Sequence, residues 1–217
     1  MIGSEAEAKA WLRTLPECDD AVMERLERLA VLLAEENTRQ NLVSAASLDS
    51  VWQRHIADSA QLLTYVPRET SAPWLDLGTG AGFPGLAIAA LRPDLRVVMV
   101  ESRTRRVEWL ERARIDLGLK NAEVVGSRLE AVEAFPVGAI SARAFAPLDR
   151  LVALSARFST SDTLWLLPKG RSAAQELDML RGWIHTFHVE QSLTDPEAGI
   201  VVGHLTGMRK GRKGPKL

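Results

Sequence analysis

A glycine-rich segment between two apolar runs constrains the fold of this chain most. It reads Asp76-Leu-Gly-Thr-Gly-Ala-Gly-Phe-Pro-Gly85. Residues 73–75 before it are typical of a strand, and residues 86–91 after it are typical of a helix. A strand–turn–helix joint presents free backbone N–H groups at the positive end of the helix, where nucleotide-like ligands bind. Three alternating glycines destabilise a joint that has no use for them, so the pattern favours a ligand site over a plain tight turn.

The spacing within this loop indicates the class of ligand. A dinucleotide-binding fingerprint needs a glycine where this chain has Phe83, so that helix and strand pack closely around a pyrophosphate. The sequence therefore favours a nucleoside ligand without a pyrophosphate, and S-adenosylmethionine is the most common such ligand on this kind of fold. We expect the loop to supply the first cofactor-binding residues, which are Asp76, Gly78, Gly80 and Gly82.

After residue 71, strand-like and helix-like runs alternate along the chain. Such alternation predicts an α/β fold with a doubly wound, mainly parallel, Rossmann-like sheet and helices on both faces. The last two strand-like runs have no long helix between them, so we expect an antiparallel pair at an edge. The seven predicted strands are residues 73–78, 96–101, 122–126, 138–145, 162–167, 184–192 and 198–205, and the predicted helices are residues 84–92, 103–118, 128–133, 147–158 and 172–181.

The first 70 residues have a different pattern from the rest. Helix-like periodicity occurs at residues 4–15, 19–36 and about 49–65. Pro67 and the polar residues after it then break the pattern and mark a seam. We therefore predict an N-terminal helical cap at residues 1–70, a main domain at residues 71–207 and a basic, flexible tail at residues 208–217.

Composition excludes several classes of protein. The chain has 217 residues, a net charge of −1 and one cysteine, Cys18. It has no secretory signal and no apolar run long enough for a transmembrane helix, so we expect a cytoplasmic protein with no membrane partner. No metal-ligand spacing occurs, so we predict no metal site. Five bases lie in the last nine residues, and such a tail suits phosphate contacts as well as a solubilising end.

Further cofactor contacts are expected where the predicted strands end, because a doubly wound sheet binds ligands beyond the carboxyl ends of its strands. Glu101 ends the second strand, about 20 residues past the loop, where a ribose diol needs a carboxylate acceptor. The alternative interpretation of Glu101 is a solvated glutamate at a strand end that binds no ligand. Leu129 and Glu130 follow the third strand, where an adenine would lie, although Glu130 also suits the first turn of a helix.

Four charged residues are candidates for positioning the substrate. Arg143 lies inside the apolar fourth strand, so it must pair with the cofactor carboxylate, a substrate phosphate or a protein carboxylate such as Asp76. Lys169 lies after the fifth strand and is a candidate for the same reason, because its charge also needs an anionic partner. His55 and Asp58 share one face of a cap helix, where they could act as acid and base or form a polar rim.

These segments together resemble the family of bacterial ribosomal RNA small-subunit methyltransferase G, also called glucose-inhibited division protein B. The resemblance runs from about Asn41 to His204, and the combination of segments is more specific than the glycine loop alone. Family members often read Ser-Arg-Ala where this chain has Ala142 between Ser141 and Arg143. The segments are Asn41-Leu-Val-Ser44, Arg54-His-Ile-Ala-Asp-Ser59, the glycine loop, Ser141-Ala-Arg-Ala-Phe145 and Pro168-Lys-Gly170.

The resemblance implies a fold, a reaction and a substrate. The family has a seven-stranded methyltransferase sheet and methylates N7 of one guanine in 16S ribosomal RNA, with S-adenosylmethionine as the methyl donor. We therefore expect a monomer whose partner is 16S ribosomal RNA, within a small ribosomal subunit or an assembly intermediate. The family's cofactor contacts map onto Gly78, Phe83, Leu129, Glu130 and Arg143.

The chemistry of this reaction bears on the remaining candidates. Guanine N7 carries a lone pair in the neutral base, so alignment and electrostatics suffice and no general base is needed. His55 and Asp58 are then a scaffold or an RNA contact. The alternatives are a methyltransferase acting on a small molecule or protein, and a non-catalytic nucleotide-binding module. Candidate RNA contacts are Arg54, Arg103, Arg105, Arg106, Arg209, Lys210, Arg212 and Lys213.

Overall fold

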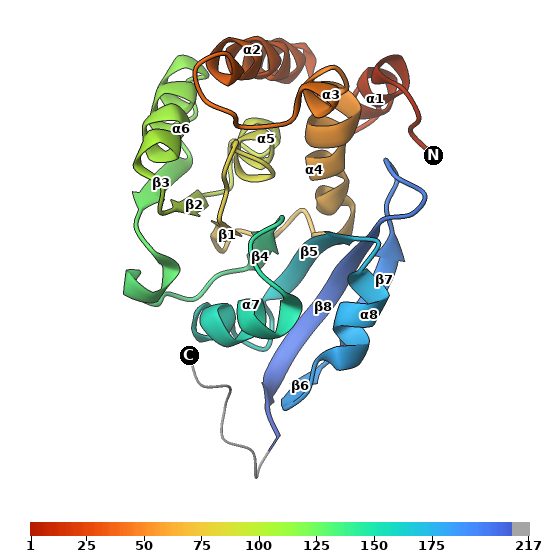
Figure 1. Cartoon of the computed structure of the whole chain (residues 1–217), viewed down its shortest axis with the longest axis vertical. Helices are drawn as coiled ribbons and strands as arrows, with labels where there is room; N and C mark the ends of the chain where they lie inside the picture. The colour runs from red at the N-terminus through yellow and green to blue at the C-terminus, as the bar shows by residue number, and fades with distance from the viewer. Residues whose placement is uncertain (210–217) are drawn as a thin grey trace.

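The computed structural model describes residues 1–209 and is built on one central sheet (Figure 1). The strands are β1 (Trp74–Leu77), β2 (Val97–Glu101), β3 (Ala122–Gly126), β4 (Ala139–Ala142), β5 (Leu164–Gly170), β6 (Trp183–His185), β7 (His188–Gln191) and β8 (Gly199–Met208). Their order is β3-β2-β1-β4-β5-β8-β6, with β7 paired to β8 off this path. The first five strands run parallel, and β8 runs antiparallel to its three neighbours. The predicted doubly wound, mainly parallel sheet is confirmed.

The sheet has eight strands rather than the predicted seven, because the run at residues 184–192 is divided into β6 and β7. Both strands pair antiparallel with β8, and β8 itself lies between β5 and β6. Gly203 of β8 has a φ of +143°, and a Cβ there would lie 2.9 Å from the backbone of Phe187. β6 and β7 are therefore separated where the backbone at Phe187 approaches Gly203 of β8, and a side chain at residue 203 would prevent that approach.

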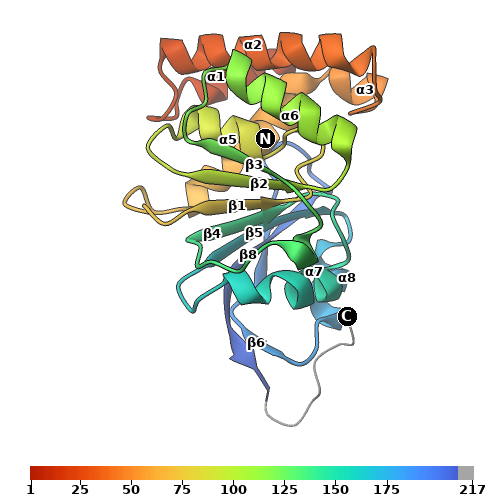
Figure 2. The ribbon, with the colours of Figure 1, turned by 90° about the vertical axis from the view of Figure 1, so that its left-hand side faces the viewer.

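Helices cover both faces of this sheet (Figure 2). Successive strand side chains alternate between two buried apolar clusters. Trp74 and Val97 belong to the first cluster, and Leu75 and Val98 belong to the second. The parallel strands are therefore apolar on both sides, as a covered sheet requires. The covering helices are α2 (Asp20–Asn37), α5 (Gly85–Leu91) and α6 (Thr104–Asp116) on the first face, and α7 (Leu148–Ser155) and α8 (Ala173–Met179) on the second.

One predicted helix of the main domain is almost absent. The helix expected at residues 128–133 is a single 3-10 turn, Leu129–Ala131. Val132 then takes an extended conformation and buries its side chain in the second cluster. Burial of Val132 thus ends the turn where periodicity alone would continue it.

The elements from Glu5 to Tyr65 are all helical, and they share the core of the first face. Asp19 begins α2 by accepting a hydrogen bond from the Val22 N–H at 2.8 Å, as an N-cap residue does. Leu26, Leu29 and Leu33 of α2 are fully buried in the cluster that also holds α5. The border expected near residue 70 is therefore a change of secondary structure, with continuous packing across it. The other cap elements are α1 (Glu5–Leu12), α3 (Ala45–Leu48), a π-helical turn (Trp52–Ala57), α4 (Asp58–Ala60) and a 3-10 turn (Gln61–Tyr65).

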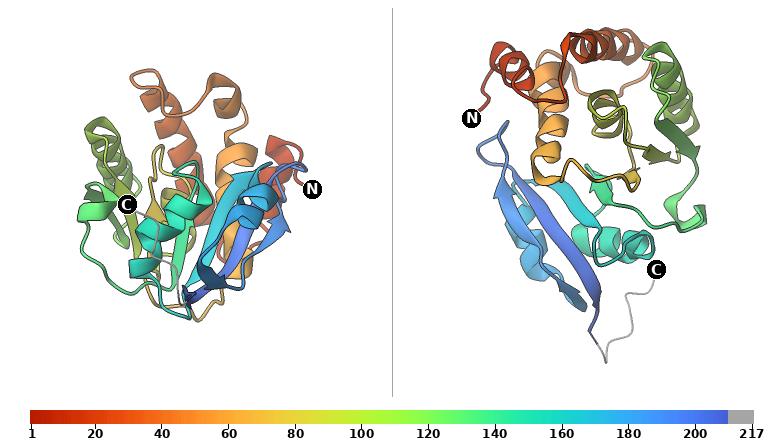
Figure 3. Two further views of the ribbon diagram at one scale, coloured as in Figure 1. Left: turned by 60° about the horizontal axis from the view of Figure 1, so that its bottom comes forward. Right: turned by 180° about the vertical axis from the view of Figure 1, so that it is seen from behind.

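Hydrogen bonds connect the N-terminal residues of the cap to the antiparallel part of the sheet. The N-terminus lies beside the connection between β7 and β8 (Figure 3), where the Ile2 N–H donates to the Leu193 carbonyl at 2.7 Å. The Glu5 carboxylate accepts from the N–H groups of Trp52 and Gln53 at 3.0 and 2.8 Å. These bonds fix the helical segment 52–65 near the carboxyl ends of β4 and β5. Within residues 1–209, no helix is long and apolar enough to cross a membrane.

Candidate active site

The glycine loop follows β1 and has the left-handed backbone that its composition predicts. Gly78, Gly80 and Gly82 have φ angles of +62°, +60° and +104°, which favour glycine. A Cβ at Gly82 would lie 2.4 Å from Leu86, and a Cβ at Gly78 would lie 2.4 Å from the Phe145 ring. The missing side chains therefore let the Phe145 ring and the Leu86 side chain pack against the loop. Gly78 lines a cavity described below, whereas Gly80 and Gly82 line neither cavity, and their contact with the cofactor stays a prediction.

Asp76 lies beneath this loop and holds it in place. Its carboxylate accepts from Ser141 Oγ at 2.8 Å, from the Gly85 N–H at 3.0 Å and from Thr79 Oγ1. Burial raises its pKa to about 6, although these three hydrogen bonds favour the ionised form. Because the side chain is fully buried and lines neither cavity described below, we assign Asp76 to support of the loop instead of the cofactor contact expected from the sequence.

Glu101 connects the end of β2 to the loop. One carboxylate oxygen accepts from the N–H groups of Ser102 and Arg103 at 2.8 and 2.9 Å. The other accepts from the Gly80 N–H at 3.0 Å, and Arg106 lies 3.9 Å from it. Glu101 is thus fixed in one orientation at the place where the sequence predicts a ribose acceptor.

A cavity of about 420 Å³ opens beside this carboxylate. We call it the cofactor cavity. Gly78, Glu101, Leu129 and Glu130 all line it, so four predicted cofactor residues from three strand ends meet at one place. Leu129 is buried, and its carbonyl accepts a hydrogen bond from Arg157. Two residues that the sequence analysis missed, Arg128 and Arg150, also line the cavity and are exposed.

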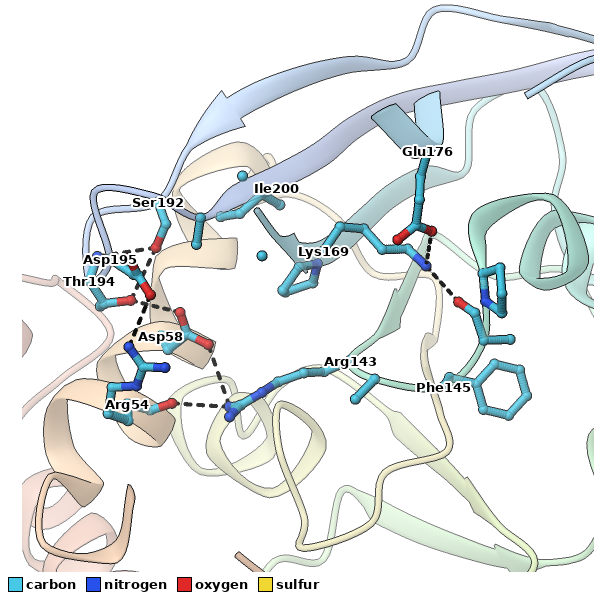
Figure 4. A pocket seen from close by; sticks show the side chains of 17 residues that line it. Arg54, Asp58, Arg143, Phe145, Lys169, Glu176, Ser192, Thr194, Asp195 and Ile200 are labelled. Atoms are coloured by element: carbon cyan, nitrogen blue, oxygen red, sulfur yellow. Dashed lines mark hydrogen bonds and ion pairs between the residues drawn. The ribbon is translucent and has the colours of Figure 1, made fainter. Parts of the chain in front are cut away.

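A second cavity, of about 610 Å³, lies against the cap (Figure 4). We call it the cap-side cavity. Residues 144–147 line both cavities, so the two are neighbours separated by the segment after β4. Ala144 in this segment has a φ of +52°, which a residue with a side chain seldom adopts. The residues that carry charge or stack around the cap-side cavity are Arg54, Asp58, Arg143, Phe145, Lys169, Glu176 and Asp195.

Arg143 reaches from the end of β4 to the helical segment 52–65. Its guanidinium donates to the Arg54 carbonyl at 3.1 Å, lies 3.1 Å from His55 Nδ1 and forms an ion pair with Asp58 at 3.4 Å. The protein carboxylate that the sequence analysis suggested for this role was Asp76. The structure pairs Arg143 with Asp58 instead, because the cap brings Asp58 to the cavity while Asp76 is enclosed below the loop.

His55 is held as a neutral imidazole between the cap and the loop. Its side chain is only 3% exposed and stacks on the Phe83 ring at 5.1 Å between centroids. Burial, and then the charges of Arg143 and Arg54, lower its pKa to about 3. A group with this pKa does not exchange protons near neutral pH, which disfavours the acid–base interpretation of the His55–Asp58 pair.

Phe83 also takes a different place from the one expected. Its ring is buried against His55 and lines neither cavity. A contact of Phe83 with the cofactor stays a prediction that rests on the resemblance.

Lys169 lies on the wall of the cap-side cavity opposite Arg143 (Figure 4). Its Nζ donates to the Ala146 carbonyl at 2.6 Å and pairs with Glu176 at 3.0 Å. Since an ammonium has three N–H donors, one remains for a ligand. Lys169 therefore fixes the segment between the two cavities and can still touch a substrate.

The predicted RNA contacts that the structure describes lie in three places. Arg54 borders the cap-side cavity, and Arg103 and Arg106 border the cofactor cavity. Arg105 is exposed next to them on α6. Arg209 follows β8, whose opposite end borders the cap-side cavity, so a ten-residue strand of roughly 30 Å separates them. The remaining predicted contacts, Lys210, Arg212 and Lys213, lie outside the described residues.

Within the described residues, no three or more His, Cys, Asp or Glu side chains gather as they would around a metal ion.

Comparison with known proteins identifies the family. The model of the family described as rRNA small subunit methyltransferase G matches residues 22–195. A ribosomal RNA small subunit methyltransferase G from Novosphingobium aromaticivorans is 62% identical over 205 residues, which cover 93% of this chain and 89% of that protein. The protein of the same name from Erythrobacter litoralis is 59% identical over 204 residues, which cover 94% and 97%.

Solved structures support the fold alone. A SAM-dependent methyltransferase from Aquifex aeolicus matches with a TM-score of 0.53 at 17% identity, covering 68% of this chain and 89% of that one. A ribosomal protein L11 methylase from Lactobacillus delbrueckii matches with a TM-score of 0.54 at 13% identity, covering 69% and 77%. The resemblance seen in the sequence is confirmed, and the chain belongs to the ribosomal RNA small subunit methyltransferase G family, whose methyl donor is S-adenosylmethionine.

Proposed function

We propose that this chain transfers a methyl group from S-adenosylmethionine to N7 of one guanine in 16S ribosomal RNA. The observation that carries this proposal is the pair of adjacent cavities, one built on the glycine loop and one against the cap, separated only by residues 144–147. Two neighbouring sites are what a methyl transfer between a cofactor and a base requires. The names of the relatives supply the class of substrate, small-subunit ribosomal RNA.

The cofactor cavity suits S-adenosylmethionine. Gly78 of the loop lines this cavity, and the Glu101 carboxylate lies there as the acceptor expected for the ribose hydroxyls. Leu129 provides an apolar wall for the adenine, and Arg143, in the neighbouring cap-side cavity, is the cation that the resemblance assigns to the cofactor. When bound, the cofactor supplies a methyl group on a sulfonium sulfur that leaves as a neutral thioether.

The protein's task in this reaction is positioning. N7 of neutral guanine already carries the lone pair that accepts the methyl group, so no proton leaves it and the product purine is a cation. The neutral, stacked His55 is consistent with this, because it holds Arg143 in place and has no proton-transfer part to play. Holding the two reactants in line can supply most of the rate.

The target base has to leave its stack to reach the cap-side cavity, as bases do in other enzymes that modify them. The volume of this cavity is within the range of ligand pockets, and Arg54 at its rim can contact a phosphate. Arg103, Arg105 and Arg106 lie where the flanking RNA would cross the cofactor cavity. We further propose that the protein acts in the cytoplasm as a monomer, on a small subunit or an assembly intermediate.

The test is methyl transfer in vitro from labelled S-adenosylmethionine to small subunits taken from cells that lack this enzyme. We expect one methyl group per 16S ribosomal RNA. Label in a protein or a metabolite, with none in the RNA, would instead support a methyltransferase of another substrate class. Calorimetry that detects NAD binding and no S-adenosylmethionine binding would support a non-catalytic nucleotide-binding module.

A further inference from the structure

Three carboxylates border the cap-side cavity, and two of them are fully engaged. Glu176 accepts from the Leu148 N–H at 2.8 Å and from Ser172 Oγ at 2.7 Å, besides its ion pair with Lys169. Asp195 pairs with Arg54 at 3.0 Å and accepts from the Glu197 N–H at 3.0 Å. Neither carboxylate is well placed to bind a further donor from a ligand.

Asp58 differs, because only one of its two oxygens is held. Oδ1 accepts from Thr194 Oγ1 at 2.7 Å and from Gln61 Nε2 at 2.9 Å. Oδ2 has only the ion pair with Arg143, at 3.4 Å, which is longer than an ordinary hydrogen bond. Figure 4 shows the carboxylate at the cavity wall, with its held side toward Thr194 and its other oxygen toward Arg143.

The geometry lets Asp58 accept a further donor without moving. Thr194 and Gln61 anchor Oδ1, so the side chain stays in place. Arg143 is itself held by the Arg54 carbonyl and His55 Nδ1, and its distance of 3.4 Å leaves Oδ2 without a close hydrogen bond. This charged oxygen at the cavity wall can therefore accept a donor from a ligand.

Guanine carries matching donors. Its Watson–Crick edge has two adjacent donors, N1–H and the N2 amino group, whereas adenine has an acceptor at N1. A carboxylate oxygen therefore attracts guanine and repels adenine at the same place. Methylation at N7 also gives the purine a positive charge, so the attraction to Asp58 grows as the reaction proceeds, which lowers the barrier.

We propose that Asp58 selects the target guanine by accepting hydrogen bonds from N1–H and the N2 amino group at Oδ2. This inference rests on the function proposed above. It makes Asp58 a residue that determines specificity, with Thr194 and Gln61 as its positioning residues.

The test compares guanine with inosine, which lacks only the N2 amino group, at the methylated position. Ligated 16S ribosomal RNA carrying either base is reconstituted into small subunits, and kcat/KM is measured for the wild type and Asp58→Asn. The wild type should methylate inosine roughly 10- to 100-fold more slowly, the effect of losing a hydrogen bond to a charged group. Asp58→Asn should lose a similar factor on guanine and show an inosine-to-guanine ratio near one.

Asp195→Asn is the matched control, since it removes a carboxylate of the same cavity and should keep the wild-type ratio. Equal rates of the wild type on guanine and inosine would overturn the inference, as would a wild-type ratio in Asp58→Asn. If Asp58→Asn does not fold, Thr194→Val releases Oδ1 instead and should lower the discrimination. Absence of any RNA methylation by the wild type would refute the proposed function itself, so the two failures are distinguishable.

Discussion

Protonation of His55 should destabilise the contact between the cap and the glycine loop. Its Nδ1 lies 3.1 Å from the Arg143 guanidinium, which can only donate, so Nδ1 accepts and the single ring proton is on Nε2. Nε2 is buried with no hydrogen-bond partner among residues 1–209. A second proton would therefore place two cationic groups face to face in a buried contact.

The magnitude follows from the pKa. Folding lowers the pKa of His55 from 6.5 to about 3. Between these values the unfolded chain binds a proton that the folded chain does not, so the free energy of unfolding falls as the pH falls. Each pH unit is equivalent to about 1.4 kcal/mol, which gives about 2 kcal/mol between pH 6.5 and 5 and about 5 kcal/mol over the whole range.

The assay is urea unfolding of the wild type and His55→Asn at pH 7.5 and pH 5. The asparagine Oδ1 can replace Nδ1 as the acceptor for Arg143, and it does not titrate. Any packing loss affects both pH values equally, so only the titration changes the difference. We expect the advantage of the wild type over the variant to be about 2 kcal/mol smaller at pH 5. A difference that changes by less than about 0.5 kcal/mol, the usual scatter of such comparisons, would refute the reasoning.

The variant is needed because Asp76 acts in the opposite direction. Burial raises its pKa from 3.8 to about 6, so the folded chain holds a proton that the unfolded chain has lost. The stability from this proton is fully present below pH 3.8 and is lost as the pH rises through 6, by about 3 kcal/mol. Between pH 3.8 and pH 6 the two contributions change with pH in opposite directions, so the wild-type curve alone would test neither.

Three further predictions concern binding. Gly80→Val should abolish cofactor binding measured by calorimetry, because a branched side chain is strained at a φ of +60° and would press on Arg106, whose Nη1 lies 3.4 Å from the site of the added Cβ; unchanged affinity would disprove the role of the loop. Arg143→Ala should weaken cofactor affinity roughly 10- to 100-fold by removing the cation expected at its carboxylate, and an affinity within a factor of two of the wild type would contradict this role. Removal of residues 209–217 should lower the salt dependence of RNA binding by about one unit of slope per lost phosphate contact, and an unaltered slope would mean that the tail does not touch RNA.

The parts predicted correctly from sequence are those set by local pattern and one rule of topology. The glycine loop, Glu101, Leu129 and Glu130 lie far apart in the chain, yet all follow parallel strands. Carboxyl ends of parallel strands share one edge of the sheet, so their meeting at the cofactor cavity could be predicted without knowing any side-chain contact.

The parts that could not be predicted depend on how the cap packs. The contact of Arg143 with His55 and Asp58 joins residues more than 80 positions apart in different types of structure. No periodicity in the sequence indicates that contact, and the same holds for the Phe83 ring against His55. The Arg143–Asp58 pair depends on the orientation of the π-helical turn and α4. Hydrogen bonds from the connection between β7 and β8, one to Ile2 and one to Asp58, help to set that orientation.

The direction of the Asp76 side chain could not be predicted either, because it also depends on a tertiary contact. A carboxylate before a glycine loop can face the ligand or lie below the loop, and the sequence is the same in both cases. Its hydrogen bond to Ser141 on the neighbouring strand β4 decides the matter, since that bond directs the side chain into the sheet.

The central claim is tested most directly by mapping N7-methylguanosine in 16S ribosomal RNA from cells with and without this protein. Chemical cleavage at N7-methylguanosine locates the modified nucleotide and distinguishes N7 from other methylated atoms. We predict one such site, absent in cells without the protein and restored by the wild type but not by Gly80→Val. An identical methylation map in both kinds of cells, or a lost methyl group on any atom other than N7, would contradict the account.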